Sequence, residues 1–344
     1  MRALVTGLST YWGGRLAQVL EQRPDVEVVV GVDTRDPRVQ LERTEFVRTD
    51  SSHSILARIV RATQVDTIVH THLIVDSTRV SGRRLHEINV IGTMNLLAAA
   101  GASQSPVRKV VLKSSALVYG ANAADPYVFR EDMSRTGAAR TNVERSLLEV
   151  EAFVRDFADD NPHVGVTLQR FANVLGDDID TPFAVALRRP VVPEIFGFDP
   201  RVQFVHEDDV VGALMYAAVN DIPGVYNVAG DDNLPWSEVC AIVGKRRLAL
   251  PFLATSLAAE PARMLRLWDL PVEALQLLRF GRTIDNSRYK RAGFRYGYTT
   301  AGTVEAFAQG LRLAATVGDK HPSYRFDRDV EDFFRHSPAV VRPE

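Results

Sequence analysis

Short apolar runs alternate with segments of helical periodicity through the first half of the chain. Runs of this length, closely flanked by turn residues, are typical of buried parallel strands. We expect these strands at Ala3–Val5, Val26–Val32, Glu45–Arg48, Thr67–His70, Lys109–Lys113 and Val164–Leu168. Between them lie helical patterns, among which the longest are at about 84–100 and 142–157. The alternation predicts an α/β fold with a doubly wound parallel sheet.

The second half of the chain has longer loops and more prolines. A helix at about 208–219 and a strand at Val225–Val228 are expected to return to the main sheet, and a last helix is expected at about 303–315. The segment 249–282 is rather apolar and predicts further helices. We therefore expect a main domain over 1–175 with return elements at about 204–245. A smaller substrate lobe is expected over 176–203 and 246–316, followed by a tail over 317–344.

The first apolar run is followed by glycines, a helix, a second apolar run and an acid. Gly7 and Gly13 lie in the turn, and Asp33 follows the second run about twenty residues after Gly13. This order is typical of one half of a dinucleotide-binding unit. The glycines let the backbone approach a pyrophosphate, and the helix N-terminus attracts it. A carboxylate at Asp33 accepts from ribose hydroxyls and repels a 2′-phosphate, which favours NAD over NADP, although Arg35 leaves NADP open.

Composition narrows the classes of function. The 344 residues are 46% hydrophobic and 24% charged, as in ordinary globular proteins, and the net charge of −2 argues against nucleic acid as the main partner. Cys240 is the single cysteine, so neither an internal disulfide nor a cysteine zinc site is expected. The chain opens directly on a strand, and no apolar stretch approaches the roughly 18 residues of a membrane span. We therefore expect a cytoplasmic protein without a membrane span.

Several segments, in this order along the chain, are similar to the motifs of one family. They are Val5-Thr6-Gly7 with Gly13 and Asp33, Asn89 to Asn95, Ser114 to Gly120, Arg170 to Gly176, Val205 to Val210, Tyr226 to Gly230 and Trp236-Ser237-Glu238. Together they span roughly residues 2–316 and resemble the extended short-chain dehydrogenase/reductases. Within these, the resemblance is to the NAD-dependent epimerase/dehydratase family, which includes UDP-glucose 4-epimerase. It implies a Rossmann-type NAD domain with a small C-terminal lobe.

The resemblance also implies which residues form the site. The positions that would contact NAD are Gly7, Thr10, Tyr11, Trp12, Gly13, Asp33, Asp50, Ser51, His70 and Asn89. Ser115 matches the family's catalytic serine, while Asn173 and Arg201 lie in the segments that face the substrate. No metal site is implied.

Four departures from the family pattern bear on chemistry. Thr10 replaces the middle glycine of the turn, and His72 stands where small residues flank the cofactor. The family's Tyr-x-x-x-Lys pair, which transfers a proton as hydride moves, is absent, and Val143 and Leu147 occupy its positions. The arginine that pairs with a substrate diphosphate is replaced by Val202, with Arg201 one residue earlier. On an extended strand that offset points the guanidinium to the other face.

Three functions are consistent with these residues. The first is an NAD-dependent epimerase, dehydratase or oxidoreductase acting on a sugar or nucleotide sugar through an atypical site around Ser115. Tyr119, Tyr127 and His72 are alternative candidates for proton transfer there. The second is a catalytically lapsed NAD-binding sensor or partner protein, and the third is a dehydrogenase of a hydrophobic alcohol. A homodimer through helices 84–100 and 142–157 is compatible with each of them.

Overall fold

The structure is a computed structural model, and it describes residues 1–76, 78–250, 270–317 and 339–340. Within this part of the chain, seven parallel strands form one sheet in the order β3-β2-β1-β4-β5-β6-β11. Along that order the strands are Thr44–Arg48, Val28–Asp33, Arg2–Thr6, Thr67–His70, Lys109–Ser115, Gly165–Phe171 and Gly224–Val228. The predicted doubly wound parallel sheet is confirmed.

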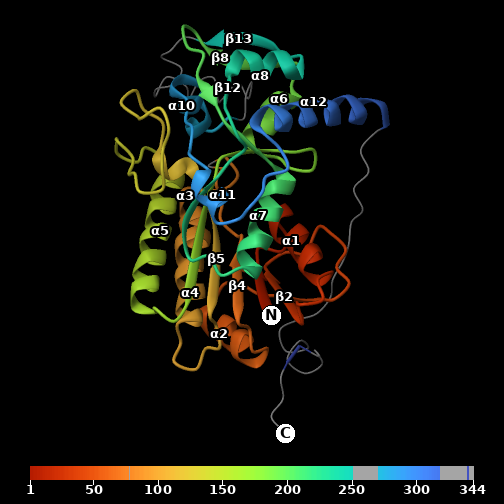
Figure 1. The fold of residues 1–344 in the computed structure, drawn as a ribbon, viewed down its shortest axis with the longest axis vertical. Helices are drawn as coiled ribbons and strands as arrows, with labels where there is room; N and C mark the ends of the chain where they lie inside the picture. The colour runs from red at the N-terminus through yellow and green to blue at the C-terminus, as the bar shows by residue number, and fades with distance from the viewer. Residues whose placement is uncertain (77, 251–269, 318–338, 341–344) are drawn as a thin grey trace.

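Helices cover both faces of this sheet (Figure 1). Alternate strand residues such as Val5 and Val111 pack under α1 (Tyr11–Glu21) and α7 (Glu207–Val219). The residues between them, such as Leu4 and Leu112, pack under α2 (His53–Ala62), α4 (Gly92–Ala100) and α5 (Asn142–Asp160). Both faces are therefore apolar, which explains why the strands appear in the sequence as nearly continuous apolar runs.

The expected helix at 84–100 consists of α3 (Gly82–His86), a π-helical turn (Glu87–Ile91) and α4. Asn89 lies in the π turn, fully buried, and its amide grips the backbone of Ile74 through two hydrogen bonds of 2.8 Å. The same amide nitrogen donates to Ser146 Oγ on α5 at 3.1 Å. A π turn is a common site of such specialised contacts. Here it ties the loop after β4 to two helices.

The smaller lobe lies beyond the C-terminal end of the sheet (Figure 1). Its core brings together side chains such as Phe183, Trp236 and Leu278. Its helices are α6 (Pro182–Arg188), α8 (Trp236–Val243), α10 (Val272–Phe280) and α12 (Thr300–Val317). Helix α8, expected above among the return elements, shares this core.

Short strand pairs and turns connect the lobe to the sheet. The pairs are β8 (Val191–Ile195) with β13 (Arg246–Leu250), β7 (Asn173–Leu175) with β10 (Phe204–His206), and β9 (Arg201–Val202) with β12 (Leu234–Pro235). A 3₁₀ turn (Ala116–Tyr119) follows β5, and α11 (Ser287–Arg291) contacts β11. Of the apolar segment 249–282, residues 251–269 lie outside the described part of the chain. No helix in the described part is both long and apolar enough to span a membrane.

His70 is enclosed at the C-terminal end of β4. Its Nδ1 is 2.6 Å from Thr6 Oγ1, and its Nε2 is 3.0 Å from Thr93 Oγ1. Burial lowers the pKa of His70 to about 3, with a smaller contribution from His72. The folded protein therefore holds this imidazole neutral.

This burial predicts acid sensitivity. Below the ordinary histidine pKa of 6.5, His70 is protonated in the unfolded chain but stays neutral in the folded protein. The free energy of unfolding therefore falls as the pH drops from 6.5 towards 3. We expect the free energy of unfolding of the wild type to fall by about 1.4 kcal/mol per pH unit more than that of His70→Gln. Urea unfolding between pH 7 and 5 measures both slopes. Exposed His53→Gln serves as the control, and a wild-type slope in His70→Gln would contradict the assignment.

Candidate active site

A cavity of about 390 Å³ opens at the carboxyl ends of the central strands. Its walls are the start of α1, the loop after β4, the ends of β5 and β6, the loop before α6, and α10. The sheet order reverses between β1 and β4, and this is the switch point at which doubly wound sheets bind ligands. Of the residues predicted from the sequence, those that border the cavity are Thr10, Tyr11, Trp12, Ser115 and Asn173.

The glycine turn brings the N-terminus of α1 to this cavity. Gly7 has φ +76°, and a Cβ on Gly13 would lie 2.3 Å from the Gly7 carbonyl oxygen. Thr10 does not block the turn, because its hydroxyl donates to Gly7 O at 2.6 Å and accepts from Gly13 N at 3.2 Å. The threonine that replaces a family glycine is therefore the N-cap of α1.

Asp33 supports the loops beside the turn. Its carboxylate accepts from the backbone amides of Ser9 at 2.8 Å, Thr34 at 2.6 Å and Arg35 at 3.2 Å. The side chain is buried and does not border the cavity. Ser9 does border it, and its buried hydroxyl has no hydrogen-bond partner among the described residues. Arg35 and Arg38, from the loop after β2, line the cavity together with Ser9.

Four other predicted cofactor residues lie outside the cavity lining. The His70 ring faces the core with both nitrogens bonded, and buried Asn89 holds the Ile74 backbone. Both side chains support the structure beside the cavity, and their contact with a cofactor stays a prediction. Asp50 and Ser51 are exposed beyond β3.

The alternative proton donors are not at the cavity either. Tyr119 is buried, and its hydroxyl accepts from Arg170 at 2.8 Å and donates to Asn227 at 2.9 Å. Tyr127 is 70% exposed. His72 packs behind Gly7, and burial lowers the pKa of its ring. Neither Tyr119 nor His72 borders the cavity, and a role for either in proton transfer stays a prediction.

The face of α5 that would carry the family's tyrosine and lysine is an apolar core. Val143 and Leu147 are both fully buried and pack with Ala116, Val118 and Phe129. None of the residues of α5, all of which the structure describes, borders the cavity. The side chains of α5 therefore do not line this cavity.

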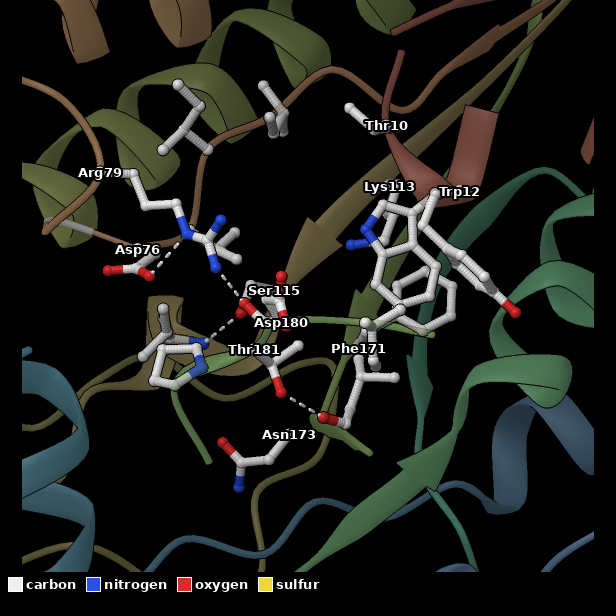
Figure 2. Close-up of a pocket in the computed structure, with 18 of the residues that line it drawn as sticks. Thr10, Trp12, Asp76, Arg79, Lys113, Ser115, Phe171, Asn173, Asp180 and Thr181 are labelled. Carbon is white, nitrogen blue, oxygen red and sulfur yellow. Dashed lines mark hydrogen bonds and ion pairs between the residues drawn. The ribbon is translucent and has the colours of Figure 1, made fainter. Parts of the chain in front are cut away.

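The part of the cavity away from the glycine turn is bordered by Ser115, Asn173 and Arg79 (Figure 2). Asn173 donates to Gln203 O at 3.1 Å. Arg79 pairs with Asp76 at 3.2 Å and reaches across to donate to the carbonyl of Asp180. Loops after β4 and β7 are joined in this way.

Arg201 is not part of this wall. Its side chain is exposed and donates to Asn233 at 3.1 Å, while neighbouring Val202 is fully buried. The alternation of side chains along a strand places Arg201 and Val202 on opposite faces, and the substrate contact expected of Arg201 stays a prediction.

Lys113 and Arg79 are two residues of the cavity lining that were not predicted from the sequence. Lys113 lies on β5, and its Nζ is 4.8 Å from the centre of the Trp12 ring and 5.3 Å from that of Phe171. Burial lowers the pKa of Lys113 to about 8. The available signal was a lysine inside a buried parallel strand, a place where charged residues are rare.

A parallel sheet with a glycine turn and a cavity at its switch point defines a dinucleotide-binding protein. Residues 3–229 match the model of the NAD dependent epimerase/dehydratase family, and the chain belongs to this family. An "uncharacterized protein" of Mycobacterium tuberculosis (strain ATCC 25618 / H37Rv) is 33% identical over 92% of this chain and 86% of its own length. The UDP-glucose 4-epimerase of Erwinia amylovora is 28% identical over 51% of this chain and 54% of that enzyme.

Solved structures share the fold at lower identity. MoeE5 in complex with UDP-glucose and NAD has a TM-score of 0.70 and 20% identity, covering 92% of this chain and 100% of that one. The UDP-glucuronic acid 4-epimerase from Bacillus cereus in complex with NAD has a TM-score of 0.70 and 18% identity, covering 94% and 100%. At these identities the likeness establishes the architecture.

The contacts of Asp33 predict a structural role that is measurable without cofactor. Asp33→Ala leaves three backbone amides without their acceptor, so we expect a loss of about 1.5–3 kcal/mol in the free energy of unfolding. Urea denaturation of the cofactor-free protein measures this loss. Asp36→Ala is the control, because it removes only a largely exposed ion pair with Arg48. Equal stability of the two variants would contradict the supporting role.

Proposed function

We propose that the protein is an NAD-dependent enzyme of the epimerase or dehydratase type that acts on a nucleotide sugar. The observation that carries this proposal is the continuity of the cavity. One space of about 390 Å³ joins the glycine turn, where a dinucleotide would bind, to Ser115 and Asn173, where a substrate would bind. A cofactor and a substrate would therefore meet above the end of β5.

The turn and its neighbours fit NAD. Gly13 lets the turn pack closely against the Gly7 carbonyl, Thr10 folds its hydroxyl into that turn, and the N-terminus of α1 at the cavity would attract a diphosphate. Ser9 offers an unpartnered hydroxyl at the end bordered by Arg35 and Arg38, which suits the hydroxyls of a ribose. When bound, NAD supplies a reversible acceptor of hydride.

At the other end the chain supplies a hydroxyl, an amide and a cation. Ser115 is placed to hydrogen-bond a substrate oxygen, and Asn173 to fix its orientation. Arg79 is the cation that suits the diphosphate of a nucleotide sugar, taking the task that Val202 cannot perform. UDP-glucose, found with MoeE5, is the first substrate to examine.

One observation favours the second candidate, a lapsed NAD-binding sensor or partner protein. The apolar packing of Val143 and Leu147 removes the family's proton-transfer pair entirely. The third candidate, a dehydrogenase of a hydrophobic alcohol, draws on Ala274 and Leu277 of α10, which line one wall. Cytoplasmic location and a homodimer remain predictions, the latter supported by exposed Ile91 and Met94 on the helix of residues 82–100.

Two measurements separate these candidates. Calorimetric titration of protein stripped of cofactor with NAD and then NADP tests binding. Incubation of the NAD-loaded protein with UDP-glucose, UDP-galactose and UDP-glucuronic acid, followed by chromatography of the products, tests turnover. Binding with turnover supports the enzyme, and binding without turnover on any sugar supports the sensor. Absence of NAD binding would refute both.

Ser115 should matter for turnover and not for cofactor binding. Ser115→Ala removes a hydroxyl that would stabilise charge on the reacting oxygen, so we expect kcat to fall about 10²–10³-fold with the Kd for NAD unchanged. Steady-state kinetics on the best nucleotide sugar, together with calorimetry, measures both constants. Ser237→Ala, at the start of α8, is the control, because that hydroxyl bonds Asp199 outside the cavity lining. An unaltered kcat in Ser115→Ala would remove Ser115 from the mechanism.

Restoring the family's pair should destabilise the protein. Val143→Tyr with Leu147→Lys inserts a larger ring and an ammonium into a fully buried apolar cluster. We expect the double variant to lose at least about 1–3 kcal/mol of unfolding free energy through overpacking alone. Chemical denaturation measures the change, with Glu149→Lys on the exposed face of α5 as the control. Wild-type stability of the double variant would mean that α5 still has room for the pair.

A further inference from the structure

Lys113 lines the cavity from the same strand as Ser115. Side chains alternate along β5, so Val111, Lys113 and Ser115 project toward the face covered by α1 and α7. Both Lys113 and Ser115 border the cavity. In Figure 2, Lys113 lies beside Trp12, with Ser115 between them and Arg79. The lysine thus reaches the site from the strand that carries the serine.

The side chain of Lys113 is enclosed by its surroundings, but no acidic partner among the described residues balances its charge. Its side chain is 5% exposed, and its ammonium makes no hydrogen bond or ion pair within the described residues. Two aromatic faces, those of Trp12 and Phe171, enclose it instead. A buried ammonium without an anion is costly, and such groups concentrate at functional sites.

We propose that Lys113 is the proton-transfer group of this site, acting beside Ser115 on the same strand in place of the family's pair, whose positions on α5 are apolar. The proposal rests on the proposed function. As the hydroxyl of the substrate is oxidised, its O–H bond breaks and the proton forms an N–H bond on the neutral amine of Lys113. Ser115 holds the same oxygen by a hydrogen bond. Bound NAD would supply the acceptor for the hydride from the same carbon, so that oxidation of the alcohol would be balanced by reduction of the cofactor.

The charged groups around Lys113 are compatible with a neutral amine. Burial lowers the pKa of Lys113 to about 8, so the amine is present near neutral pH and above. Among the packed elements, α1 presents Tyr11, β4 is followed by His72, and α7 begins with Glu207. On β6, Arg170 is already paired with Glu151 at 2.6 Å.

Acids and bases also face Lys113 across the cavity. Asp178 and Asp180 come from the loop before α6, Glu273 from α10, and Arg35 and Arg38 from the loop after β2. Asp76 and Arg79 are paired with each other. Burial is the one cause that shifts the pKa of Lys113, so none of these groups acts as its counter-ion.

The test compares Lys113→Met, which cannot bind a proton, with Lys113→Arg, which cannot release one. Lys109→Met is the matched control on the same strand, because Lys109 donates to the carbonyls of Ala218 and Asn220 outside the cavity. Calorimetry with NAD and a thermal melt establish that each variant is folded and loaded. We expect kcat to rise through pH 8 in the wild type and in Lys109→Met. Both Lys113 variants should lose about 10²–10⁴-fold in kcat and this pH dependence.

A second readout needs no turnover. Deprotonation beside the Trp12 ring should change the tryptophan emission of cofactor-free protein with a midpoint near pH 8. The change should be present in Lys109→Met and absent from both Lys113 variants and from Trp12→Phe. An emission midpoint above pH 10, or wild-type kcat in folded, NAD-loaded Lys113→Met, would overturn the proposal. A midpoint near pH 8 without turnover on any sugar would refute the proposed function while supporting a titrating amine at Lys113.

Discussion

The approach of Gly13 to the carbonyl of Gly7 is the contact on which the geometry of the site depends. A Cβ at residue 13 would lie 2.3 Å from that oxygen, so only glycine lets α1 begin directly above the end of β1. From this start, the helix presents its N-terminus to the switch point of the sheet and brings the Trp12 ring over Lys113. A wider turn would move both the anion-attracting end of the helix and the ring that covers the lysine.

The strands and helices of the main sheet follow from the apolar pattern, and the structure places them within a few residues of expectation. The apolar pattern indicates where strands and helices lie, but it says less about which face of a strand each side chain occupies. In a strand buried on both faces, nothing in an apolar run distinguishes the two sides. The sequence therefore places His70 at the end of β4, but it does not indicate whether the ring faces the core or the cavity. The same holds for Arg201, which the structure places on the exposed face of β9 while neighbouring Val202 is buried.

The cavity itself was predictable at the glycine turn, Ser115 and Asn173, where motifs carry the information. The rest of its lining comes from contacts between distant segments, such as Arg79 with the carbonyl of Asp180, which no local pattern specifies. The π turn at Asn89 was hidden for a similar reason, since its cause is a hydrogen bond to the Ile74 backbone. Lys113 was visible as an anomaly in β5, but its meaning required Trp12 and Phe171 to be placed beside it.

The apolar side chains at positions 143 and 147 of α5 change the dielectric surroundings of the site. With Val143 and Leu147 packed into the core, one side of the cavity is backed by hydrocarbon. Charges interact more strongly next to such a wall than in water. Lys113 and Ser115 lie at the end of β5, where the backbone is paired with Gln169 and Phe171 of β6. A functional side chain on a central strand is held more rigidly than one on a surface helix.

Thr10 gives the turn its shape before any ligand arrives. Its hydroxyl bonds both Gly7 and Gly13, so the conformational entropy of this segment is lost during folding and not during association. A residue with a side chain also has fewer conformations in the unfolded chain than glycine, which lowers the cost of ordering the turn. The departure from the family pattern thus converts a loop that would be ordered by its ligand into one that is ordered by its own sequence.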